Sequence, residues 1–251
     1  MKKLRTNLKA IVIIASVIAM VRPMANAQDS TKKSVDFTTN VDLYSRYLWR
    51  GMQNGNAPAI QPTIKMTYKN FSFGAWGSVQ ASDLASTSLP ETDLFATYTL
   101  PKGFSVTVND YFVSADEANL GNYFDYDQNS VNSLHQIEGV LAFAGPEKFP
   151  LSASVGYTFY GQKWVASAPA NMNGSIYAEL DYQVKNLTII AAGGNKYYTT
   201  STMKEDFVPV NIGVKVVQKT VITDKFTLPI TGQIMINPNT KHIYYTVGFS
   251  F

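Results

Sequence analysis

The C-terminal segment of this chain constrains its fold most strongly. Apolar and aromatic residues occupy every second position from Ile243 to Phe251, and small or polar residues occupy the positions between them. This period of two predicts a β-strand with one apolar face. A membrane strand that ends on an aromatic residue and closes against the first strand is typical of outer-membrane β-barrels.

The N-terminal segment has the pattern of a secretory signal peptide. Several basic residues precede an apolar run of twelve residues, 10–21, and a small-residue cleavage site follows at 25–27. The apolar run is too short to cross a bilayer as a helix, which disfavours an uncleaved anchor. We therefore expect residues 1–27 to be removed during export and residues 28–251 to form a domain in the outer membrane of a Gram-negative bacterium.

Removal of residues 1–27 changes the charge balance of the chain. The precursor has a formal net charge of +3, but five of its basic residues and none of its acidic residues lie in the signal peptide. The mature chain therefore has a net charge of −2, and we expect no nucleic-acid partner. The chain contains no cysteine, which excludes disulfides and cysteine zinc sites. We expect no metal site and no cofactor.

The mature chain contains many alternating segments of about ten residues, which is the length of a tilted membrane strand. The expected strands are 35–50, 59–68, 71–80, 91–100, 104–112, 133–143, 151–160, 176–184, 187–197, 207–217, 226–236 and 241–251. Short turns alternate with longer polar loops between these segments, as in outer-membrane barrels. The sequence therefore predicts an all-β fold, a single transmembrane antiparallel up-and-down barrel of about 12 strands with both termini periplasmic.

Alternation does not by itself show which face of a strand points inward. A soluble barrel of the lipocalin kind has the same pattern with its apolar face inside. Aromatic residues gather at both ends of the expected strands, as they do at the two interfaces of a membrane. Together with the export signal and the aromatic C-terminal strand, these groups favour the membrane barrel.

Several segments resemble a known family. They are residues 42–51 (DLYSRYLWRG), 58–62 (PAIQP), 73–78 (FGAWGS) and 177–182 (YAELDY), together with Glu138 on a mid-chain strand. They are similar to segments of the TorF-type family of Gram-negative outer-membrane proteins, which are named as porins although their function is poorly defined. The resemblance implies a small barrel channel without an established substrate.

If the apolar face meets lipid, the other face lines the lumen. The inward-facing residues that we expect to line the pore are Asp42, Arg46, Arg50, Gln61, Lys65, Trp76, Asp93, Glu138, Glu179 and Asp181. Side chains of both charge signs favour small polar or charged solutes, and twelve strands leave a bore of roughly 10 Å. The alternative is that ion pairs fill a plugged lumen, in a closed structural or adhesion barrel whose extracellular loops carry the function.

Two other kinds of site have little support. Asp125, Asp127 and Asn129 have the spacing that begins a calcium loop, but the glycine and the bidentate acid that should follow are missing. A barrel-wall hydrolase would need a lipid-facing histidine, and His135 has that parity, but no serine and asparagine partner motif accompanies it. We therefore expect a protein without enzymatic activity.

The expected partners follow from this assignment. They are outer-membrane lipids, small solutes, and the barrel-assembly machinery, which we expect to bind the C-terminal strand that ends at Phe251. The sequence does not indicate an oligomeric state.

Overall fold

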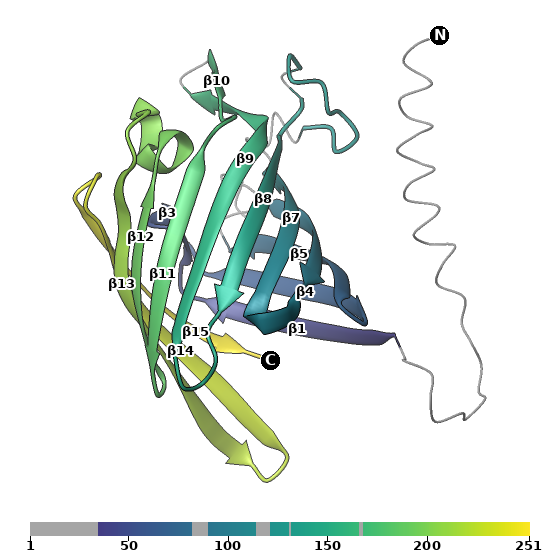
Figure 1. The fold of residues 1–251 in the computed structure, drawn as a ribbon, viewed down its shortest axis with the longest axis vertical. Helices are drawn as coiled ribbons and strands as arrows, with labels where there is room; N and C mark the ends of the chain where they lie inside the picture. Colours follow the sequence, from purple (N-terminus) through teal and green to yellow (C-terminus); the bar gives the residue numbers. More distant parts are fainter. Residues whose placement is uncertain (1–34, 82–89, 114–120, 131, 166–167) are drawn as a thin grey trace.

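The computed structural model describes residues 35–81, 90–113, 121–130, 132–165 and 168–251. These residues form a closed antiparallel barrel (Figure 1). Its wall strands are β1 (Asp36–Tyr44), β4 (Ala59–Tyr68), β5 (Phe71–Gln80), β6 (Glu91–Thr99), β7 (Phe104–Val113), β8 (His135–Ala144), β9 (Leu151–Val165), β11 (Ile176–Val184), β12 (Leu187–Gly194), β13 (Val208–Thr223), β14 (Phe226–Asn237) and β15 (His242–Ser250). The prediction of an all-β barrel of twelve antiparallel strands is confirmed.

Consecutive wall strands pair with each other all the way round, and β15 pairs with β1 to close the barrel. The remaining elements are short: β2 (Tyr47–Trp49), β3 (Met52–Asn54), β10 (Ala168–Asn171), and the 3₁₀ turns η2 (Pro101–Gly103) and η3 (Lys196–Thr202). β2 and β3 pair only with each other, and β10 pairs with the end of β9. No helix in the described part of the chain is long and apolar enough to cross a membrane. The predicted signal peptide lies outside the described residues.

The wall is apolar on its outer face and polar on its inner face. Ile234 and Tyr245 are a registered pair on β14 and β15, and they are 50% and 65% exposed. Thr246, the next residue along β15, is almost fully buried. The same alternation holds around the barrel, where exposed Val, Ile, Leu, Phe and Tyr side chains occupy the outer face. This polarity is that of a porin-like membrane barrel and the reverse of a soluble one.

Two strands differ from the sequence prediction for identifiable reasons. The prediction of a first strand at 35–50 was too long, because β1 ends at Tyr44 and the chain then leaves the wall. The strand predicted at 207–217 contains a register shift opposite Ala192 and Gly193. Such a β-bulge changes the parity of the residues before it, which explains why Phe207 and Pro209 are out of phase with the rest of the strand.

Proline residues inside the wall strands are accommodated without a change of register. β4 and β5 are paired up to Ile60 and again from Thr63, so the ladder is interrupted only around Pro62, which has no N–H to donate. Pro229 lies in the part of β14 that pairs with β13 and extends beyond its pairing with β15. The loop predicted at 218–225 is largely strand, because β13 runs to Thr223 and a tight turn leads into β14.

Candidate functional site

A hairpin inside the barrel is the central feature of the lumen. After Tyr44 the chain leaves β1, while the Ser45 N–H still donates to the Val247 carbonyl of β15 at 2.8 Å. β2 and β3 then form a two-stranded hairpin with Arg50 and Gly51 at its tip. Both tip residues have positive φ, 46° and 82°, as tight two-residue hairpin turns require. We call residues 47–54 the lumenal hairpin.

The lumenal hairpin contacts wall strands on both sides of β1, the strand that it follows. The Asn237 side chain on β14 donates to the Gly51 carbonyl at 2.9 Å, and the Gly51 Cα lies against the Val210 carbonyl of β13. On another side of the lumen, the Tyr47 ring packs on Trp76 of β5 with the ring centroids 5.5 Å apart. The hairpin therefore crosses the lumen and contacts wall strands on several sides.

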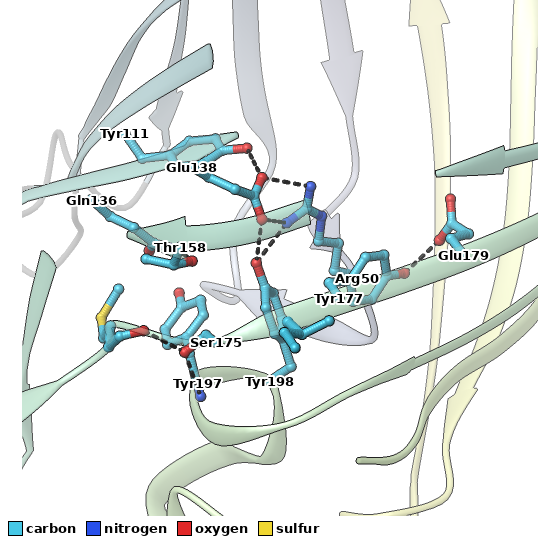
Figure 2. Close-up of polar contacts among 12 residues, drawn as sticks. Arg50, Tyr111, Gln136, Glu138, Thr158, Ser175, Tyr177, Glu179, Tyr197 and Tyr198 are labelled. Carbon is cyan, nitrogen blue, oxygen red and sulfur yellow. Dashed lines mark hydrogen bonds and ion pairs between the residues drawn. The ribbon is translucent and has the colours of Figure 1, made fainter. Parts of the chain in front are cut away.

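The tip of the hairpin is held by an ion pair with the wall (Figure 2). The Arg50 guanidinium donates to both oxygens of Glu138 on β8, with Nη1–Oε1 and Nη2–Oε2 distances of 2.6 and 2.9 Å. The Tyr111 and Tyr198 hydroxyl groups also donate to Glu138, each at 2.9 Å. Glu138 is fully buried, and four donors stabilise its charge. We call Arg50, Glu138, Tyr111 and Tyr198 the lumenal latch.

Aromatic rings surround the charge at the tip of the hairpin. The Arg50 guanidinium carbon lies 4.8 Å from the Trp49 ring centroid, 4.7 Å from that of Tyr177 and 5.5 Å from that of Tyr198. These distances are within the range of cation–π attraction. Burial raises the pKa of Tyr198 well above its usual value, so this hydroxyl remains a hydrogen-bond donor to Glu138 at physiological pH.

The structure brings together only some of the residues that the sequence predicted to line the pore. Arg50 and Glu138 form the latch, and Trp76 supports the hairpin. Arg46 is near the hairpin base, where it donates to Asn56 at 3.4 Å. The other predicted residues lie on the wall, apart from the latch. Asp42 accepts a hydrogen bond from Ser250, Gln61 donates one to Ser78, and Glu179 accepts one from Tyr177. Lys65 lines a recess, and Asp93 and Asp181 lie on β6 and β11.

Tyr111 and Tyr198 were not among the predicted pore-lining residues. Tyr111 has the inward parity of β7 and could have been found from the alternation, since it is registered opposite Gln136. Tyr198 lies in η3, within a segment expected to be an extracellular loop. No sequence pattern places such a loop in the lumen, because its position depends on packing against Tyr177 and Trp49.

A polar recess lies at the short-turn end of the lumen. It has a volume of about 510 Å³ and is lined mainly by hydroxyl and amide side chains, with one ammonium group and one aromatic ring. The residues that contribute most to this character are Asn40, Thr63, Lys65, Ser72, Phe95 and Thr97. The lumen is thus open at the short-turn end and filled by the hairpin and its contacts towards the long-loop end.

The long loop between β7 and β8 does not constrict the lumen in its described part. Its residue Tyr126 stacks on His135 with the ring centroids 3.9 Å apart and donates to Asp110 at 2.7 Å. Asp110 and His135 have the outward parity of β7 and β8, so this segment covers the outside of the wall. The His135 Nδ1 is 2.7 Å from Asp110, and its Nε2 is 2.8 Å from the Tyr123 carbonyl. Both ring nitrogens are therefore occupied by partners other than a serine nucleophile.

Comparison with known protein families assigns this chain to one of them. The sequence profile of a family described as "Bacterial protein of unknown function (Gcw_chp)" matches residues 28–235, which is most of the chain. The protein belongs to the Gcw_chp family. Its described function is unknown, so membership gives no activity to this Gcw_chp protein. A comparison with curated protein sequences found no match.

Solved structures similar to this Gcw_chp protein include porins. A KdgM porin is 12% identical, with 85% of this chain and 97% of that chain covered and a TM-score of 0.44. A KdgM porin in complex with disordered oligogalacturonate is 16% identical, with 84% and 98% covered and a TM-score of 0.46. An OmpF of Salmonella typhi in complex with daunomycin is 7% identical, with 86% and 97% covered and a TM-score of 0.35. Similarities this weak give no information about solute or mechanism.

Replacing Gly51 with alanine should release the lumenal hairpin of the Gcw_chp protein. A Cβ atom at Gly51 would lie 1.9 Å from the Val210 carbonyl oxygen, and the φ of 82° is unfavourable for alanine. We expect a loss of about 1–3 kcal/mol in the free energy of unfolding, measured by denaturant titration in detergent with tryptophan fluorescence. Gly232→Ala is the matched control, because a Cβ there meets nothing within 4 Å. Equal stability of the two variants would contradict the tight docking of the tip.

Proposed function

We propose that this Gcw_chp protein is an outer-membrane channel for the passive diffusion of small polar or charged solutes, closed in the present conformation by the lumenal hairpin. The observation that carries the proposal is a polar interior inside an apolar outer wall, filled by a separate two-stranded segment rather than by wall side chains alone. A hairpin that belongs to no wall ladder can move without breaking the barrel. The resemblance to the TorF-type family agrees with this function.

The location and partners in this proposal rest on the sequence. Export by the signal peptide, insertion into outer-membrane lipid and recognition of the strand that ends at Phe251 by the assembly machinery are parts of the same hypothesis. The start of β1 and the end of β15 lie towards the short-turn end, which is the periplasmic end in barrels of this kind. The polar recess then opens to the periplasm.

The lining of the recess suggests the kind of solute. Hydroxyl and amide groups of Asn40, Thr63 and Thr97 offer hydrogen bonds without a strong charge, and Phe95 offers an apolar face. Lys65 is the charged group among its lining residues. These groups suit small polyhydroxylated or anionic solutes better than cations.

Conductance across a planar bilayer tests this function. Purified wild-type protein should produce discrete conductance steps, and Lys65→Glu should shift the ion selectivity towards cations because it reverses the charge of the recess. Reversal potentials in a salt gradient measure the shift, and Lys148→Glu in an exposed turn is the control. A bilayer that stays tight with correctly folded protein, both with the hairpin latched and with it released, would refute the channel.

A closed structural or adhesion barrel is the second candidate. The observation in its favour is that Glu138 is completely buried and accepts hydrogen bonds from four donors. The long-loop half of the lumen is therefore tightly filled. In that case, the latch contributes only stability, and its removal lowers the free energy of unfolding without producing conductance.

A further inference from the structure

The inner wall beside the lumenal hairpin carries two carboxyl groups that the latch does not use. Glu91 and Asp93 are two residues apart on β6, so their side chains share its inner face. They are 9% and 8% exposed, and they are close enough to interact electrostatically. Within the described ranges, neither forms a salt bridge with lysine, arginine or histidine. This lack of a cation distinguishes them from Glu138.

The Asp93 carboxyl group is incompletely bonded. The backbone N–H of Phe112 lies near it, but its Oδ1 is buried without a hydrogen-bond partner among the described residues. A buried polar atom left unpaired destabilises the fold, and an uncompensated buried charge destabilises it further. A positively charged ligand at Oδ1 would remove both costs.

Two hydroxyl-bearing side chains lie beside the carboxyl groups, Ser78 on β5 and Tyr47 on the hairpin. Ser78 on β5 is registered opposite Glu91 and is almost completely buried, and its hydroxyl oxygen accepts a hydrogen bond from the Gln61 side-chain nitrogen at 3.4 Å. The Tyr47 hydroxyl of the hairpin lies close to the Glu91 carboxyl group. Carboxylate, hydroxyl and amide oxygens are the ligands that hard divalent cations prefer.

We propose that Glu91 and Asp93 bind one divalent cation of the calcium class between the wall and the lumenal hairpin. Because Tyr47 contacts Glu91, the bound ion stabilises the docked hairpin. Two carboxylates give a site of modest charge, with a dissociation constant of roughly 10⁻⁴–10⁻³ M, as in weak extracellular calcium modules. This cation-binding proposal does not depend on the proposal that the barrel is a channel.

Terbium luminescence can test the site in the full barrel folded in detergent. Trp76 is registered opposite Asp93 and should sensitise a bound Tb³⁺ ion, and Ca²⁺ should compete with it. Glu91→Gln and Asp93→Asn should each weaken Ca²⁺ competition by roughly tenfold or more, because each removes a charged ligand. Glu205→Gln, an exposed acid beside Lys196, should bind as the wild type does.

Further measurements keep the result decisive if one variant does not fold. Trp76→Phe removes the tryptophan registered opposite Asp93 and leaves the ligands, so tryptophan-excited luminescence should weaken while Ca²⁺ still raises the thermal unfolding midpoint. Ca²⁺ should raise that midpoint in the wild type and in Glu205→Gln, but not in Glu91→Gln or Asp93→Asn. Wild-type protein without Ca²⁺-competed luminescence would overturn the proposal. Equal Ca²⁺ binding by the carboxylate variants and the wild type would also overturn it. The same holds if the thermal unfolding midpoint depends on pH but not on Ca²⁺, because two acids that share a proton would behave in that way.

Discussion

Replacement of Glu138 with alanine should convert the closed barrel into an open one. The substitution leaves Arg50 buried without its carboxylate partner, and breaking a buried pair in this way costs about 3–5 kcal/mol. The hairpin can avoid this cost by carrying Arg50 out of the lumen into water. A change of that size shifts the ratio of docked to undocked hairpin by roughly a hundredfold or more. Single-channel recording in planar bilayers should therefore show a much higher open probability than in the wild type.

Two further variants make this experiment specific. Arg50→Ala removes the other partner and should open the barrel as well, and the double variant should be no more open than either single variant, because the two residues act as one pair. Asp181→Asn is the control, since it changes a charge on the short-turn half of β11, where Asp181 is registered with Ser152 and Ile190. If Glu138→Ala is less stable but no more conductive than the wild type, the latch has a structural role and the closed barrel is the better description.

Arginine in place of Ile234 should impair insertion into lipid. Ile234 lies on the outer face of β14 and is half exposed, so the substitution places a charge in the hydrocarbon region. The expected cost is about 2–4 kcal/mol near the bilayer midplane. Folding yield and unfolding free energy in phospholipid vesicles measure this effect, and it should be much smaller in detergent micelles, where an arginine side chain reaches water more easily.

The adjacent residue provides the matched control for Ile234. Gln233 is next in sequence and, by the alternation of β14, faces the lumen, where an arginine stays in contact with water. Gln233→Arg should therefore fold in vesicles nearly as well as the wild type. If Gln233→Arg impaired folding in vesicles and Ile234→Arg did not, the assignment of the apolar face to the outside of a membrane barrel would be wrong.

The wall of the barrel was predictable from sequence because each strand repeats one simple rule. Alternation along segments such as 151–160 and 241–251 reports which side chains share a face, and this property is local to the strand. Pro62 interrupts the ladder without moving the ends of its strand, and the bulge opposite Gly193 changes the parity of the residues before it, but neither changes the strand count. The closure of β15 on β1 follows once twelve antiparallel strands are present.

The contents of the lumen were harder to predict. Arg50 continues the alternation of the first predicted strand, so the pattern assigned it to the wall, whereas positive φ at Arg50 and Gly51 turns the chain inward. That turn is stabilised by Glu138 and Asn237, which are distant in sequence. A single sequence contains no periodic signal for contacts of this kind. The ten predicted pore-lining residues therefore included both halves of the ion pair without indicating that they meet.

The two mouths of this barrel are unequal, which gives the molecule a direction. A solute entering through the short-turn mouth passes the recess around Lys65 and stops at the hairpin, whereas one arriving from the other side meets the closed face of the latch first. A transmembrane electric field exerts a force on the positive charge of Arg50. Depending on the sign of the voltage, this force draws the hairpin towards one mouth or holds it in its docked position. If the protein is the channel that we propose, we expect its current to rectify, so the voltage sign that passes more ions would report the orientation of the protein in the membrane.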